Sequence, residues 1–161
     1  MIDPRYQEIP ATRIPIGQTE DGLATVRVIA GSSLGARAVI ETRTPIIYLH
    51  FTLQPGGSVS QQVPFEYNGF AYVISGEGLF GADGEKASRG QMVMFAQDGD
   101  EVTIQNAGNS PLELLLIAGV PLGEPISRYG PFVMNTREEI QQAFEDYRSG
   151  RMGAIVSEVS G

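Results

Sequence analysis

The sequence has 161 residues, among them 20 glycines and 10 prolines, and only 19% of its residues are charged. This length predicts one domain, and frequent turn residues with few charges favour many short strands over a helical bundle. The absence of cysteine excludes disulfides, thiolate catalysis and cysteine-ligated metals. The net charge of −8 without a basic cluster argues against nucleic-acid binding. No apolar run suits a membrane span or a leader, so we expect a soluble cytoplasmic protein.

Residues 1–18 contain three prolines, which disfavour helix, and are expected to form an extended arm. The β-rich run 23–30 is the first predicted strand, and 45–53 is the second. The second run alternates strictly, so one face of the strand carries apolar side chains: Ile47, Leu49, Phe51 and Leu53. The other face carries Tyr48, His50 and Thr52.

The central stretch 55–78, PGGSVSQQVPFEYNGFAYVISGEG, predicts two further strands joined by a bend. Residues 76–78 (Gly-Glu-Gly) follow one strand and precede another, which indicates a hairpin turn rather than a phosphate-binding loop. Asp83-Gly84 is a two-residue hairpin signal between the next two short strands. Strands are also expected at 92–95, 102–105 and 111–118. The last of these, PLELLLIA, is almost continuously apolar, which predicts a strand covered on both sides.

The pattern changes after residue 120. Residues 121–135 contain three prolines and are expected to be irregular. Thr136 and Glu139 form a capping box, which predicts a helix over about 137–149. Its apolar residues recur with helical spacing and form one stripe: Ile140, Ala143, Phe144 and Tyr147. A helix this short is marginal alone in water, so the stripe must pack on another surface.

The spacing of residues 55–78 resembles the first motif of the cupin family. Metal-binding cupins have His, His and Glu at three positions of this motif, pointing into a small β-barrel. Here those positions are Gln62, Pro64 and Gly69. Residues 90–107 resemble the second cupin motif, whose last histidine position falls on Glu101 or Val102. The resemblance implies the spacing of a metal site without its ligands.

A second resemblance covers nearly the whole chain and is with the C-terminal half of the pirin family. It rests on EPISRYGPFVMNTREEIQQAFEDYRSG (124–150), PRYQEIP, VRVIAG and YLHFTLQPGG. Pirins are two-domain cupins with one iron in the N-terminal domain, held by three His and a Glu, and are associated with quercetin dioxygenase activity. Some act as nuclear co-regulators of a Rel-type transcription factor. The sequence begins where that N-terminal cupin has ended, so none of the iron ligands carries over.

The resemblance implies an all-β fold, a cupin double-stranded β-helix barrel of jelly-roll type with one short C-terminal helix. The expected parts are the arm 1–18, a barrel 19–120 and a segment 121–161 whose helix packs on the barrel, as a single domain. In this barrel the candidate pocket residues are Gln62, Pro64, Gly69, Ala71, Val73, Met92, Met94, Phe95 and Glu101. Either neighbouring side chains fill the space left at Gly69, or a small apolar ligand does.

Two other features of the sequence are weak candidates for a metal site. His50 is the only histidine, and one imidazole cannot supply a cupin metal site, so we interpret it as a solvated residue of its strand's polar face. The acidic residues 98–101 are too few for a calcium loop and indicate a polar turn.

We therefore predict a protein with no catalytic residues, metal ligands or cofactor, acting as a structural or protein-interaction module. The alternatives are a quercetinase-like dioxygenase that needs a metal or a partner cupin domain, and a small-molecule sensor that uses the barrel interior. The expected partner is a second copy or another cupin domain, because the arm, residues 129–134 and the tail 152–159 are more than one small barrel needs. A homodimer is expected, with neither nucleic acid nor membrane as partner.

Overall fold

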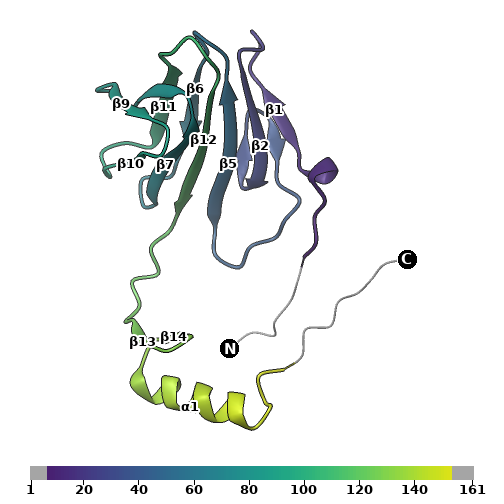
Figure 1. Cartoon of the computed structure of the whole chain (residues 1–161), viewed down its shortest axis with the longest axis vertical. Helices are drawn as coiled ribbons and strands as arrows, with labels where there is room; N and C mark the ends of the chain where they lie inside the picture. Colours follow the sequence, from purple (N-terminus) through teal and green to yellow (C-terminus); the bar gives the residue numbers. More distant parts are fainter. Residues whose placement is uncertain (1–6, 154–161) are drawn as a thin grey trace. The chain divides into compact units, whose positions relative to one another are not determined.

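The computed structural model describes residues 7–153, and in that range the chain forms two compact units (Figure 1). The barrel unit comprises Ile9–Pro121, and the C-terminal unit begins at Leu122. The predicted packing of the helix on the barrel stays a prediction. The first six residues of the arm and the apolar positions 155, 156 and 159 of the tail lie outside the described residues.

Two antiparallel sheets face each other in the barrel unit (Figure 1). The six-stranded sheet contains, in spatial order, β1 (Ile16–Gln18), β2 (Ala24–Ala30), β5 (Ile46–Leu53), β12 (Leu112–Gly119), β7 (Asn68–Ser75) and β10 (Met92–Met94). The four-stranded sheet contains β6 (Ser58–Gln62), β11 (Glu101–Asn106), β8 (Glu77–Phe80) and β9 (Glu85–Ser88). A small hairpin, β3 (Ser32–Ser33) and β4 (Ala36–Arg37), and a 3-10 turn at Ala11–Arg13 complete this unit.

The core lies between the two sheets and follows the two-residue period of the strands. In β5 the predicted apolar set is buried, and the alternate residues of the same strand are partly exposed. The fully buried large side chains come from both sheets and include Phe51, Phe80, Ile104, Leu114 and Leu116. Because one face of each sheet is apolar, packing the two faces together removes both from water.

The central strand β12 differs from its prediction. It lies between β5 and β7, and its inward residues, such as Leu114 and Leu116, are fully buried. Leu115 and Ile117 point to the other side of the sheet and are only half-buried. The strand is therefore fully covered on one side only, although its sequence is apolar on both.

The predicted hairpin at residues 76–78 is a corner between the two sheets. β7 ends at Ser75 in the six-stranded sheet, and β8 begins at Glu77 in the four-stranded sheet. Gly76 has a φ of 80°, and a β-carbon there would lie 2.6 Å from the carbonyl oxygen of Pro111. Only glycine fits this bend without strain. The hairpin predicted at Asp83-Gly84 is confirmed, because β8 pairs with β9, although its turn spans residues 81–84 rather than two residues.

Asn106 connects the two sheets from the end of β11. Its side-chain nitrogen donates to the carbonyl oxygens of Leu53 and Ser110, both at 2.9 Å. Its side-chain oxygen accepts from the backbone N–H of Gly108 at 2.8 Å. With Asn106 only 3% exposed, these bonds satisfy a buried amide that would otherwise be costly.

The C-terminal unit contains a short hairpin and one helix: β13 (Ser127–Tyr129), β14 (Phe132–Met134) and α1 (Arg137–Arg148). The hairpin corrects the prediction of an irregular segment. Pro131 lies in the turn, where it needs no ladder hydrogen bond, and Gly130 supplies a positive φ of 58°. Phe132 packs edge-to-face on Phe144 of the helix, with ring centroids 4.9 Å apart. The aromatic residues of the hairpin thus bury part of the predicted helix stripe.

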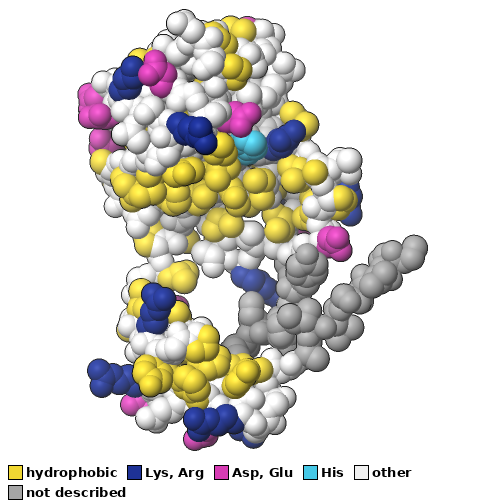
Figure 2. Space-filling view, in the orientation of Figure 1, with side chains coloured by type: hydrophobic (Ala, Val, Ile, Leu, Met, Phe, Trp, Pro, Cys, Tyr) yellow, Lys and Arg dark blue, Asp and Glu magenta, His cyan; other side chains and the backbone are white. Residues whose placement is uncertain are grey.

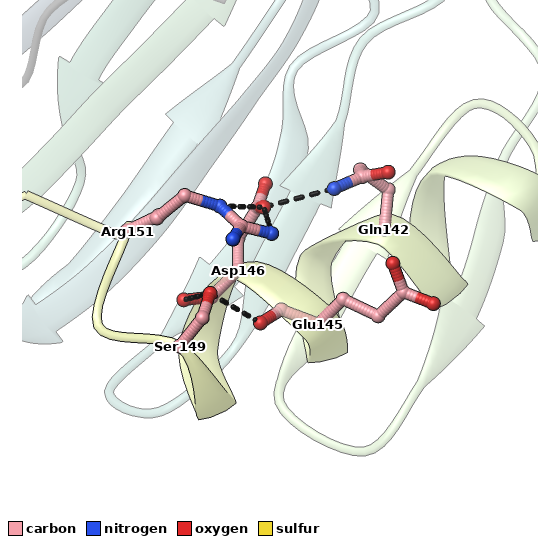
Figure 3. A network of polar contacts seen from close by, with 5 residues as sticks. All are labelled: Gln142, Glu145, Asp146, Ser149 and Arg151. Atoms are coloured by element: carbon pink, nitrogen blue, oxygen red, sulfur yellow. Dashed lines mark hydrogen bonds and ion pairs between the residues drawn. The ribbon is translucent and has the colours of Figure 1, made fainter.

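The helix begins and ends with specific polar contacts. Thr136 and Glu139 form the predicted capping box, in which each side chain accepts from the other's backbone N–H. Near the other end, Asp146 accepts from Gln142 at 2.8 Å and from Arg151 at 3.1 Å (Figure 3). The hydrogen bond from Gln142, followed by the contacts from Arg151, lowers the pKa of Asp146 below its usual value.

The predicted arm is partly regular. Ile16–Gln18 pairs with β2 as an edge strand, so the arm joins the sheet at its last three residues. Over residues 7–153, no helix has the length and apolar character needed to cross a membrane.

Candidate functional site

The barrel unit contains an open cavity of about 390 Å³ at the end where β6 stops and β11 begins. Its apolar wall comes from both sheets and from the loop after β10: Val63, Phe80, Val93, Phe95, Leu116 and Ala118. Of these, Phe80 and Leu116 are fully buried and Ala118 is 3% exposed. The wall is therefore a continuation of the hydrophobic core and can accept apolar groups.

The mouth of the cavity is acidic. Asp83, Glu85, Asp98 and Glu101 lie along it, and all four are exposed. Glu101 accepts a hydrogen bond from the side chain of Gln62 at 2.7 Å. No group of three or more His, Asp or Glu residues within 7–153 is arranged to hold a metal ion. Residues 98–100 lie between β10 and β11, whereas Glu101, which the sequence placed in the same polar turn, is the first residue of β11.

The structure brings some of the predicted pocket residues together and separates others. Pro64, Gly69, Met94, Phe95 and Glu101 line the cavity. Ala71 and Val73 are fully buried in the core beside it, whereas Met92 is 56% exposed. Gln62 is exposed and lies outside the lining.

Gln62 corrects the prediction that it points into the barrel. In β6, Val59 and Gln61 are the buried residues, so the next residue lies on the opposite face of the strand. The inward position beyond it is Val63, which is buried and lines the cavity. A shift of one residue reverses the face of every side chain in a strand, and spacing alone does not resolve it.

The burial pattern of β11 likewise distinguishes Glu101 from Val102, the two residues that the sequence left open for the last histidine position of the second cupin motif. Val102 is 6% exposed and points inward, and Glu101 lies at the mouth. Sequence reasoning had left Val102 open against Glu101, and it missed Val63 and three residues of the buried wall: Phe80, Leu116 and Ala118. The run 111–118 is apolar on both faces, so no signal in its sequence singles out the last two.

The residues present do not fit the iron that metal-binding cupins hold. Iron sites of this kind use imidazole and carboxylate ligands. The inward positions that line the cavity carry Val63, Gly69 and Val102, which offer no donor atom. Gln61 is also inward, but it lies outside the lining, and its side-chain nitrogen donates to the backbone oxygens of Ser32 and Gln62. His50 lies on the outer face of β5, where it is half-buried, and its Nε2 has no hydrogen-bond partner in the described part of the chain. It is therefore less solvated than predicted, and it does not line the cavity.

Comparisons with known proteins agree with the resemblance found in the sequence. The family model described as the Pirin C-terminal cupin domain matches residues 48–153. A pirin-like protein of Solanum lycopersicum is 41% identical over 153 residues, which cover 95% of this chain and 52% of that protein. Pirin of Homo sapiens is 41% identical over 154 residues, with the same two coverages. The chain spans about half the length of these curated relatives.

A solved structure gives the same answer for the fold. Quercetin 2,3-dioxygenase from Acinetobacter baumannii superposes with a TM-score of 0.81 at 30% sequence identity, covering 94% of this chain and 52% of that one. The family model and this superposition confirm the predicted all-β cupin barrel with its short C-terminal helix.

Proposed function

This chain belongs to the pirin family, matching its C-terminal cupin domain, and from this premise we propose that it is a non-catalytic domain that works without a metal ion. Its role is that of a structural or protein-interaction module. The observation that carries the proposal is the chemistry of the inward-facing positions at the cavity. Where a metal-binding cupin needs nitrogen and oxygen donors, Val63, Gly69 and Val102 provide none.

Two further observations support the proposal. The cavity wall is apolar, so a metal ion there would lose its hydration without gaining ligands. The carboxylates at the mouth are exposed, so water screens them, and the carboxylate of Glu101 is held by its hydrogen bond from Gln62.

A quercetinase-like dioxygenase is the second candidate, favoured by the similarity to a quercetin 2,3-dioxygenase. The chain matches 52% of that enzyme's length. In this candidate function, a separate cupin domain would hold the metal and this domain would support it. A small-molecule sensor is the third candidate, favoured by the cavity of about 390 Å³ with its apolar wall.

One set of assays tests the non-catalytic proposal against turnover by the chain itself and against binding of a small molecule. The purified chain is incubated with Fe²⁺, Ni²⁺, Cu²⁺ or Zn²⁺, and quercetin consumption is followed by absorbance against a control with metal alone. We expect no consumption above that control, and repeated turnover would overturn the non-catalytic proposal. A concentration-dependent rise in melting temperature with quercetin, without turnover, would favour the sensor.

A further inference from the structure

The outer face of the six-stranded sheet carries two rows of mainly apolar side chains across four strands. Strand register places Tyr48, Ile117, Phe70 and Met94 in one row, on β5, β12, β7 and β10. The neighbouring row on the same strands is His50, Leu115, Tyr72 and Met92. We call these eight residues the apolar face. Figure 2 shows hydrophobic side chains gathered in a band across the barrel unit on this side.

The apolar face is open to solvent to a degree that a sheet of this kind normally avoids. Tyr72, Met92 and Met94 are 41%, 56% and 65% exposed. Leu115 and Ile117 are half-buried, although they belong to the central strand. The outer face of an antiparallel sheet is usually polar when water covers it. β12 carries apolar residues on its outward side as well as its inward side. A second surface that covers the apolar face would explain these outward residues.

Polar residues border the apolar face along one side. The next row along the strands consists of Thr25, Thr52, Glu113 and Ser75. An apolar centre with a polar rim is the usual anatomy of a protein interface.

The charge of this side of the sheet suits a second copy of the same chain. Among the outward side chains of its six strands, only Arg27 and Glu113 are charged, and their charges are opposite. The whole chain carries −8, so two copies repel each other over most of their surfaces. The apolar face is a nearly neutral region through which two copies can approach.

The size of the sheet also suits a dimer. Strands lie about 4.8 Å apart and outward residues repeat about every 6.8 Å along a strand, so the eight residues of the apolar face cover about 260 Å² and the whole outer side of the six-stranded sheet covers about 600 Å². A dimer centred on the apolar face that also buries the surrounding residues of the sheet would bury about 1,200 Å² in the two copies together, at the lower end of the range for specific interfaces.

We propose that the apolar face is the surface through which two copies of this chain form a dimer, sheet against sheet. A two-fold axis brings the same patch of each copy together and closes the assembly at two copies. This inference deepens the proposed interaction module and rests on it, by naming the partner and the surface. It places the contact on the sheet, whereas the sequence suggested the arm and the C-terminal segment.

The test compares two double variants with the same change in net charge. Tyr72→Glu with Met92→Glu places two carboxylates on the apolar face, at positions paired across β7 and β10. Ser60→Glu with Thr103→Glu places two carboxylates on the outer side of the four-stranded sheet, also at a cross-strand pair of exposed residues. Circular dichroism checks that each double variant folds. If the apolar-face double variant does not fold, the single variant Met92→Glu replaces it, because Met92 is an exposed residue on an edge strand.

Sedimentation velocity between about 1 and 100 µM gives the dissociation constant of each protein. We expect the wild type to reach twice 17.3 kDa, and the apolar-face variant to weaken the dimer by about tenfold or more. The variant of the four-stranded sheet should have the same dissociation constant as the wild type. Because the contact is apolar, 1 M salt should not dissociate the wild-type dimer. A monomeric wild type, or equal effects of both variants, overturns the proposal. Metal content measured on the same samples reports separately on the non-catalytic function.

Discussion

A β-carbon on Gly69 would lie 3.2 Å from the β-carbon of Ala118, across the pair of strands β7 and β12. Gly69 lines the cavity, and the resemblance to the first cupin motif aligns it with the glutamate position of metal-binding cupins. The neighbouring strand thus occupies the space near Gly69, so a side chain there is tolerated only if Ala118 or Phe95 gives way.

We therefore predict that Gly69→Ala costs about 1 kcal/mol of unfolding free energy, since a neighbour must move by a few tenths of an ångström. Gly69→Glu should cost about 2 to 4 kcal/mol at pH 8, because it places a carboxylate against an apolar wall. Urea denaturation measures both. Such a carboxyl has a raised pKa, so the deficit of Gly69→Glu should shrink as the pH falls through that value. An unchanged midpoint for the Glu variant would show that residue 69 does not point inward.

Asn106 gives a prediction for the junction of the two sheets. Asn106→Ala should lower the unfolding free energy by about 2 to 3 kcal/mol, because two carbonyl oxygens and one N–H lose their partner in a buried site. The exposed neighbour Gln105→Ala is the matched control and should stay within about 0.5 kcal/mol of wild type. Equal effects of the two substitutions would mean that water satisfies this junction.

Asp146 gives a prediction for pH. Its folded pKa is lowered, so its contribution to stability is complete above the ordinary value of 3.8 and is lost as the pH falls through the folded value. Helix content measured by circular dichroism should therefore differ between wild type and Asp146→Asn at pH 6, and the difference should vanish toward pH 2. Glu145→Gln is the control, because only the backbone oxygen of Glu145 takes part in the network of Figure 3. A difference that persists at the lowest pH would contradict the charge-based explanation.

Features that depend on local period could be predicted from the sequence. The alternation of 45–53 gave the correct buried face of β5, and Thr136 with Glu139 placed the start of the helix at its observed position. In both cases the deciding residues lie within a few positions of each other. The spacing of the cupin motif likewise predicted the fold.

Features that depend on partners far apart in the chain could not be predicted. Gly76 signals a bend, but only the pairing of β7 and β8 with different strands makes it a corner between sheets. The orientation of Gln62 depends on the register of β6 against β11, which motif spacing leaves open by one residue. The hydrogen bond from Asn106 to Leu53 spans 53 positions, and no local pattern announces it.

The most direct test of the central claim is the metal content of the chain. After incubation with Fe²⁺, Ni²⁺, Cu²⁺ and Zn²⁺ in turn and extensive dialysis, mass spectrometry of the elements measures the ions bound per chain. The account predicts less than about 0.1 ion per chain for each metal, because the inward positions of the cavity offer no nitrogen or carboxylate ligand. A value near one ion per chain for any of these metals would contradict it.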